Sequence, residues 1–228
     1  MTVLHYVLEE QAVYLLTDTV VSDPATMRPM AFTSKVFSAP HWQGVMTGTG
    51  ICPFVVEWAF TSMSTILARD FVHLDEYAPK ALRRLYPKYQ KMAGPAATST
   101  VYHFGFNEDE GRFVGFAYRS ANKFVSERLP YAIGLKPDPE YGPEEAVELN
   151  AFPADFISVA QRQKTRDEAK PINERVGVGG KLIAYYLNRF EDQDGALRVR
   201  TSMHECYDFP DYGRAYALAC DALPSNAV

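Results

Sequence analysis

The stretch TVLHYVLEEQAVYLLTDTV, residues 2–20, contains two apolar runs rich in β-branched and aromatic residues, with a short polar segment between them. This composition predicts two strands joined by a hairpin. The second run ends on Thr-Asp-Thr, so the carboxyl group of Asp18 closes a strand that is otherwise apolar. An acidic side chain at the end of a strand that enters a core needs an explanation other than packing.

Two more strands are predicted over residues 31–39 and 42–50, and an antiparallel sheet is the simplest arrangement for four strands so close in sequence. Residues 53–71 are predicted to form an amphipathic helix, because apolar side chains recur at spacings of three and four, at Val56, Phe60, Met63, Leu67 and Phe71. A second helix is predicted from Asp75, as its N-cap, to about residue 92.

The second half of the chain predicts a strand pair over residues 100–120, a helix over 154–169, and a last strand pair over 179–190 and 196–209. A tail or short helix follows. Residues 130–153 are rich in proline and acidic residues and predict an irregular excursion over the surface. The chain is therefore interpreted as a single α+β domain over residues 1–228, with sheets flanked by helices.

Composition and charge argue against several classes of function. The net charge of −5 provides no basic field for nucleic acid, and no apolar stretch is long enough to span a membrane, so neither is expected as a partner. The three cysteines are widely separated, which favours reduced thiols and a cytoplasmic location. The five histidines lack metal-ligand spacing, and no glycine-rich phosphate motif opens a helix, so no metal and no cofactor are predicted.

The segment order, together with Thr2, Asp18, Lys35 in TSKVF and Gly48 in MTGTG, resembles the proteasome-like branch of the N-terminal-nucleophile (Ntn) hydrolases. The resemblance covers residues 2 to about 204. It implies a four-layer αββα sandwich, in which two antiparallel sheets lie between outer helices. Asp18 lies at the family's spacing from Thr2, whereas Lys35 lies one residue beyond its usual place.

The resemblance also implies a role for each residue. Thr2, once Met1 is removed, would be the nucleophile, and its own α-amine would be the base. Lys35 would lower the pKa of that amine through its positive charge, and Asp18 would orient Lys35 through a charge-assisted hydrogen bond. The backbone amide of Gly48 would stabilise the oxyanion.

Two departures from the family pattern bear on activity. The loop over residues 132–140 has no serine, and Arg175 and Val178 stand where active members carry an aspartate and a serine. The first interpretation is therefore a non-catalytic building block of a homo-oligomer or larger assembly, such as a virion or tail. The alternative is a Thr-dependent hydrolase of peptide or amide substrates. A third interpretation is an unrelated α+β protein, in which Asp18 and Lys35 are surface charges.

Overall fold

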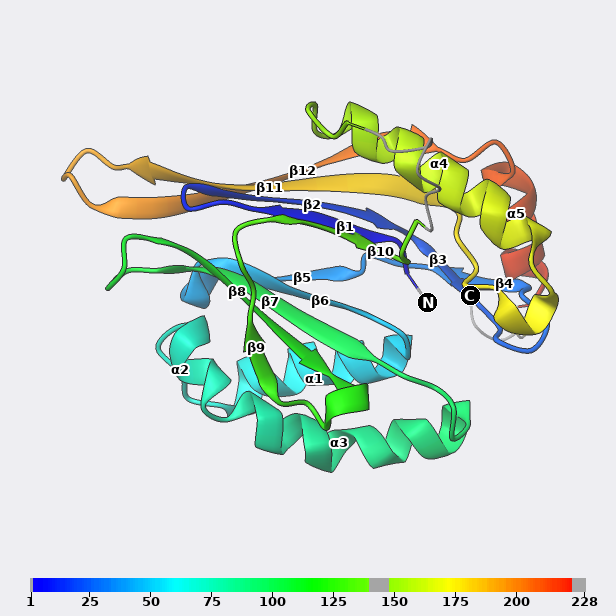
Figure 1. Cartoon of the computed structure of the whole chain (residues 1–228), viewed down its shortest axis with the longest axis horizontal. Coiled ribbons are helices and arrows are strands. Elements are labelled where there is room, and N and C mark those ends of the chain that lie inside the picture. The colour runs from blue at the N-terminus through cyan, green and yellow to red at the C-terminus, as the bar shows by residue number, and fades with distance from the viewer. Residues whose placement is uncertain (1, 140–147, 223–228) are drawn as a thin grey trace.

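The computed structural model describes residues 2–139 and 148–222 and contains two five-stranded antiparallel sheets (Figure 1). In spatial order, the first sheet consists of β10 (Ile133–Lys136), β1 (Leu4–Leu8), β2 (Ala12–Asp18), β11 (Lys181–Glu191) and β12 (Leu197–Asp208). The second sheet consists of β5 (Val36–Ala39), β6 (Gly44–Thr49), β7 (Thr100–Asn107), β8 (Arg112–Arg119) and β9 (Ser126–Arg128). A small separate ladder pairs β3 (Val20–Ser22) with β4 (Pro29–Phe32).

The helices lie on the outer faces of these sheets (Figure 1). The second sheet is covered by α1 (Cys52–Thr65), α2 (Phe71–Asp75) and α3 (Ala78–Ala93), whereas α4 (Ala154–Ala169) and α5 (Tyr212–Asp221) lie on the side of the first sheet. The protein is thus a mixed α+β structure built on antiparallel sheets.

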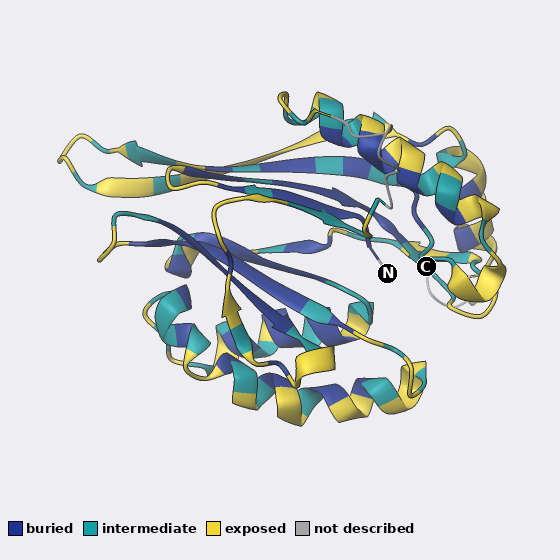
Figure 2. Ribbon diagram, in the orientation of Figure 1, coloured by how far each residue is buried: buried dark blue, intermediate teal, exposed yellow. Residues whose placement is uncertain are grey.

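Apolar side chains fill three successive layers of this arrangement. One cluster packs α1–α3 against the second sheet, one fills the space between the sheets, and one packs the first sheet against α4. In the middle cluster Tyr6 of β1 contacts Phe104 of β7, with ring centroids 5.2 Å apart. The inner strands are therefore buried on both faces, as Figure 2 shows.

Burial on both faces explains why the N-terminal hairpin is apolar almost throughout. Leu4 and Leu15 point into the layer between the sheets, whereas Val3 and Leu16 belong to the cluster against α4. Strands covered on both faces are expected to lack polar alternation. The hairpin predicted from residues 2–20 is present, with Leu4 opposite Thr17 and Leu8 opposite Val13.

The prediction of one sheet for the first four strand segments was wrong. The chain leaves the first sheet after Asp18, passes through the β3–β4 ladder, and enters the second sheet at Val36. The segment predicted as a strand over 31–39 is accordingly broken, because β4 ends at Phe32 and β5 begins at Val36. The break places Lys35 at the junction between the two sheets.

The predicted first helix was wrong in its C-terminal end and in part of its apolar face. The helix ends at Thr65, and Phe60 and Leu67 are 68% and 93% exposed. The buried side chains are instead those of Phe54, Val55, Trp58 and Ala59, because the two large rings fill the space under the second sheet.

The limits of the next helices differ from the prediction too. Asp70 caps α2 by accepting a hydrogen bond from the His73 amide, and α3 begins only at Ala78. Asp75 is not an N-cap, since its carboxylate accepts a hydrogen bond of 2.7 Å from the Tyr118 hydroxyl.

The predicted excursion over residues 130–153 contains a strand. β10 pairs with β1, with Lys136 opposite Leu4, so this part of the prediction was wrong. The proline residues on both sides of β10 concealed a short edge strand. Residues 140–147 of the predicted excursion lie outside the described residues.

Two buried histidines make the stability of the fold dependent on pH. His103 is fully buried and accepts a hydrogen bond of 2.9 Å from the Trp58 indole, and burial lowers its pKa to about 3. Burial likewise lowers the pKa of His5 to about 4. The unfolded chain therefore binds protons at a higher pH than the folded protein does, and acid favours unfolding.

We expect the free energy of unfolding to fall as the pH drops from about 6.5 toward 4, by roughly 1.4 kcal/mol per pH unit for each of these two groups. Urea titrations at several pH values measure this slope, and His103→Gln should reduce it. His41→Gln, at an exposed position, is the matched control and should leave the slope unchanged. An equal slope in His103→Gln and the parent would contradict this account.

Candidate functional site at Asp18 and Lys35

A buried ion pair joins the two sheets where β2 ends and β5 is about to begin. The Lys35 Nζ lies 2.8 Å from Oδ1 of Asp18, and the two side chains are 4% and 0% exposed. Each residue stands at a strand end, so the backbone of each sheet holds one partner of the pair. The charge-assisted hydrogen bond expected between Asp18 and Lys35 is present in the structure.

The carboxylate of Asp18 has two further donors. The amide of Val3 donates to Oδ1 over 2.9 Å, and the amide of Gly179 donates to Oδ2 over 3.2 Å. A buried carboxylate is costly unless its oxygens accept hydrogen bonds, and here one cation and two backbone amides supply them. Asp18 thus ties together the first strand, the junction at Lys35 and the segment that precedes β11.

Thr2 lies directly before this network in the chain. The peptide that links Thr2 to Val3 donates to the same carboxylate oxygen that binds Lys35. Thr2 itself is only 6% exposed, and Lys35 only 5%. The structure therefore brings Thr2, Asp18 and Lys35 into one buried cluster at the end of the N-terminal hairpin.

Gly48 is placed beside this cluster by the pairing of β5 with β6. Val36 is opposite Thr47, so the same register continued by one residue sets Lys35 opposite Gly48. The Thr47 hydroxyl also donates to the Lys35 carbonyl over 2.8 Å. A Cβ atom at Gly48 would approach a Val55 methyl group of α1 to 2.7 Å, so packing alone requires glycine here.

The segment before β11, residues 176–180, completes the cluster on the side of Gly179. Asp167, which fixes the start of this segment, was not singled out from the sequence. Asp167 of α4 accepts hydrogen bonds from the amides of Val176 and Gly177, of 2.6 and 2.8 Å. Gly180 has a φ of +82°, and a Cβ atom there would lie 2.4 Å from the Thr19 hydroxyl oxygen. The consecutive glycines at 179 and 180 were the available signal for a close backbone approach.

Arg175 and Val178, which stand where the resemblance implies an aspartate and a serine, have other contacts. The Arg175 guanidinium donates to the carbonyls of Lys170 and Glu168, at 2.8 and 2.7 Å, and so binds the C-terminal end of α4. Val178 is 6% exposed and packs in the cluster between the first sheet and α4. Neither side chain contributes a hydrogen-bonding group to Asp18 or Lys35.

Cys52, the first residue of α1, lies close enough to the ion pair to be influenced by its charges. Burial raises the pKa of the Cys52 thiol, while Lys35 lowers it and Asp18 raises it further. Because burial is the largest of these effects, the thiol is held protonated at neutral pH. Cys52 is thus a neutral neighbour of the cluster.

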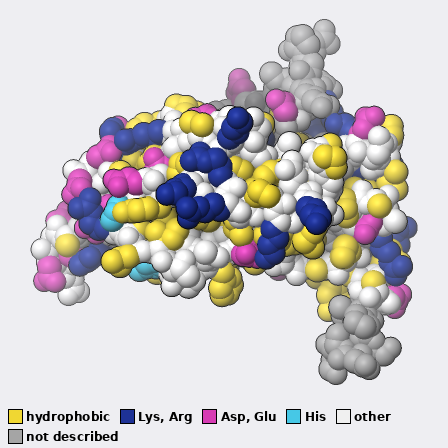
Figure 3. Space-filling model, turned by 90° about the horizontal axis from the view of Figure 1, so that it is seen from below, with side chains coloured by type: hydrophobic (Ala, Val, Ile, Leu, Met, Phe, Trp, Pro, Cys, Tyr) yellow, Lys and Arg dark blue, Asp and Glu magenta, His cyan; other side chains and the backbone are white. Residues whose placement is uncertain are grey.

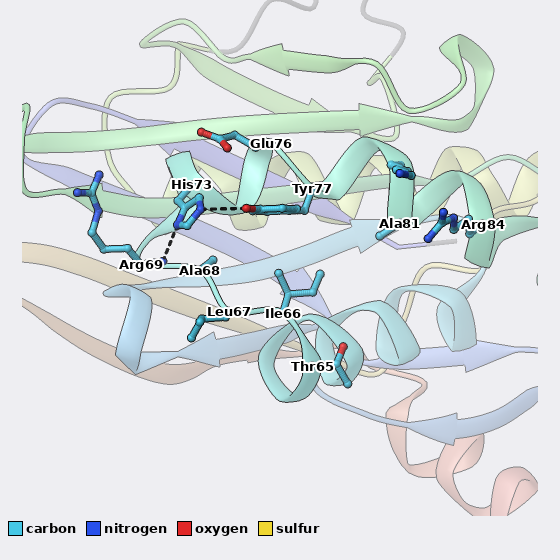
Figure 4. A pocket seen from close by; sticks show the side chains of 11 residues that line it. Thr65, Ile66, Leu67, Ala68, Arg69, His73, Glu76, Tyr77, Ala81 and Arg84 are labelled. Carbon is cyan, nitrogen blue, oxygen red and sulfur yellow. Dashed lines mark hydrogen bonds between the residues drawn. The ribbon is translucent and has the colours of Figure 1, made fainter.

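A pocket of 790 Å³ lies elsewhere, at the C-terminal end of α1 and against α2 and α3 (Figure 4). Its lining includes Leu67, Arg69 and Tyr77, and His73 spans it with hydrogen bonds to the Arg69 amide and the Tyr77 hydroxyl. Cys52 and Thr65 mark opposite ends of α1, which at 14 residues is about 20 Å long. The pocket is therefore remote from Asp18 and contains none of the predicted site residues.

Within residues 2–139 and 148–222, no group of three or more His, Cys, Asp or Glu side chains is arranged to hold a metal ion. None of the helices described there has the length and apolar character needed to cross a membrane. No family model matches the sequence, and no curated protein is detectably similar to it.

Proposed function

We propose that this chain has the four-layer αββα sandwich of the Ntn hydrolases. Two features support the assignment: helices cover the outer faces of two antiparallel sheets, and the Asp that ends β2 binds the Lys that precedes β5. A third feature is the position of Gly48 in the strand beside Lys35. The second and third features lie together at the end of the hairpin that begins with Thr2.

We further propose that the protein is an N-terminal threonine hydrolase that cleaves peptide or amide bonds after Met1 is removed. The observation that carries this proposal is the shared carboxylate oxygen, which holds the Lys35 ammonium beside the peptide that follows Thr2. A buried ion pair is no better for stability than a well-packed apolar pair. The position of this pair beside the Thr2–Val3 peptide favours a catalytic role over the non-catalytic one that the sequence placed first.

The reaction requires no group from outside the cluster. The Thr2 hydroxyl gives its proton to the free α-amine while its oxygen attacks the substrate carbonyl carbon, and the carbonyl electron pair moves to the oxygen. The Gly48 amide donates to that oxyanion. The leaving amine takes the proton from the α-ammonium and an ester remains on Thr2. Water then gives a proton to the α-amine and attacks the ester carbonyl carbon, and the α-ammonium returns that proton to the Thr2 oxygen as the acid leaves.

Lys35 and Asp18 act on the base in this scheme. The positive charge of Lys35 disfavours protonation of the nearby α-amine, so the amine is neutral and able to accept a proton near neutral pH. Asp18 fixes the position of Lys35 and balances its charge within the buried cluster. Both are positioning residues, whereas Thr2 and the Gly48 amide contact the reacting atoms.

A second candidate function is a non-catalytic subunit of a larger assembly. The contacts of Arg175 and Val178 favour it, because these residues serve α4 and the apolar cluster and offer no hydrogen bond to the α-amine of Thr2. In this case Asp18 with Lys35 serves only to join the sheets, whether or not Met1 is removed.

The two candidates differ in what they require of the N-terminus. We expect the intact mass of the purified protein to show loss of Met1, and a β-lactone probe to add its mass once, as an ester on Thr2. Thr2→Ala is the matched control and should add none. Retention of Met1 would select the non-catalytic subunit.

A further inference from the structure

Strand β12 forms one edge of the first sheet and is paired on one side only. Eleven of its twelve residues pair with β11, and no other strand of the described residues pairs with it. An unpaired edge presents a row of free backbone N–H and C=O groups to the outside. What binds there must therefore supply an extended backbone.

The side chains of this edge are exposed, and one face of it is apolar. No residue of β12 is buried, and Figure 2 shows the exposed end of the strand. Leu197, Val199, Thr201 and Met203 alternate on the face that looks toward the second sheet, since Met203 is opposite Tyr185 of the core. Met203 is 68% exposed and Leu197 38%.

The features that usually keep a long edge strand from pairing with another chain are absent from the first eight residues of β12. The Arg198 guanidinium binds Asp192 at 3.1 Å, and Arg200 lies over the Phe190 ring at 4.8 Å, so both cations are directed back to their own hairpin. The strand contains no proline, and its register shift lies at the far end, near Cys206. A flat exposed edge of this kind is a template for another strand.

We propose that β12 is the pairing surface for β12 of a second copy of this chain, antiparallel about a two-fold axis at Thr201. In that register Thr201 faces its own counterpart, and Val199 of each copy faces Met203 of the other. Cross-strand Thr pairs and apolar pairs on one face both stabilise antiparallel sheets. The first sheet of one copy then joins the first sheet of the other to form one sheet of ten strands. The interface is self-complementary, as a two-fold contact requires.

The shape and charge of the molecule favour this edge over the helical face. Figure 1 shows the end of the β11–β12 hairpin extending past the helices, which leaves the start of β12 clear of α4 and α5. The helical face on the outer side of the second sheet carries the exposed Phe60 and Leu67. It also carries the basic side chains of α3, a helix with five Lys and Arg residues and no acidic one (Figure 3). Two copies joined through α3 would therefore place like charges together.

Sedimentation analysis over a range of protein concentrations tests the proposal. The parent protein is expected to dimerise, and Met203→Lys to weaken the dimer by at least about tenfold, since it places two cations in the new ladder. Leu67→Lys, at an exposed apolar position on the helical face, should leave the dimer unchanged. A strictly monomeric parent, or a dimer that Leu67→Lys disrupts and Met203→Lys does not, would overturn the proposal.

Disulfide trapping provides a second readout that does not depend on how well Met203→Lys folds. In a Cys220→Ser background, oxidation of Thr201→Cys should produce a covalent dimer, because these residues face each other across the axis. Ser202→Cys is the control, since its two copies would lie beyond the reach of a disulfide. Equal yields from the two variants would refute the pairing. None of these results depends on whether Thr2 is catalytic.

Discussion

Replacing Asp18 with Asn is expected to lower the free energy of unfolding by about 3–5 kcal/mol. The substitution keeps the shape of the side chain but removes its charge, so the Lys35 ammonium remains buried without a counter-ion. The amides of Val3 and Gly179 also lose a charged acceptor. Chemical denaturation monitored by circular dichroism measures the change.

A control comes from the pair between Lys88 and Glu57, whose Nζ and Oε2 lie 2.6 Å apart and whose side chains are 59% and 34% exposed. Water screens such a pair, so Glu57→Gln should alter stability little. The double variant Asp18→Leu with Lys35→Met removes both buried charges, and it should recover much of the stability that Asp18→Asn loses. If Asp18→Asn and Glu57→Gln have the same small effect, the buried pair does not hold the sheets together.

The Thr2→Ala variant is expected to lose turnover of amide substrates by roughly three orders of magnitude or more, because it removes the nucleophile. Thr2→Ser keeps a hydroxyl on the same backbone and should retain measurable turnover. The measurement is kcat/KM on a panel of fluorogenic peptide amides. Thermal unfolding of each variant shows whether the fold is intact. Turnover by Thr2→Ala equal to that of the parent would exclude Thr2 as the nucleophile.

Lys35 is tested in the same assay through its effect on the base. Without the nearby ammonium, the α-amine of Thr2 holds its proton to higher pH, so Lys35→Met should move the rising limb of the pH–rate profile in the alkaline direction. Lys88→Met, which removes an exposed lysine, should leave the profile unchanged. A uniform loss of rate with no shift of the profile would mean that Lys35 only supports the structure.

The parts of the fold that sequence predicts well are those whose pairing is local. The N-terminal hairpin and the β11–β12 pair each consist of β-rich runs joined by a short polar turn, and both are present. The division of the first four strand segments between two sheets was missed, because the residues around Lys35 break a run that reads as one strand. The exposed side of α1 was missed because Phe60 is apolar yet faces solvent.

The candidate site was predictable only where its chemistry lies in side chains. Asp18 was found because a carboxylate stands out at the end of an apolar strand, and Lys35 because the family resemblance implied a role for it; the two are in contact. The amide of Val3, which donates to Asp18, has no signature in the sequence, since every residue except proline carries the same donor. For Gly179, the other amide donor, the only signal was the pair of consecutive glycines. In the sequence, Asp167 is one more charged residue of a predicted helix. Only the fold shows that its carboxylate accepts hydrogen bonds from the amides of residues 176 and 177.

The most direct test of the central claim is the mass of the native protein before and after treatment with the β-lactone probe, followed by peptide mapping. The account predicts a chain that begins at Thr2 and a single ester on the Thr2 hydroxyl, absent from Thr2→Ala and slowed in Lys35→Met. A chain that retains Met1, or a probe bound at Cys52 and not at Thr2, would contradict it.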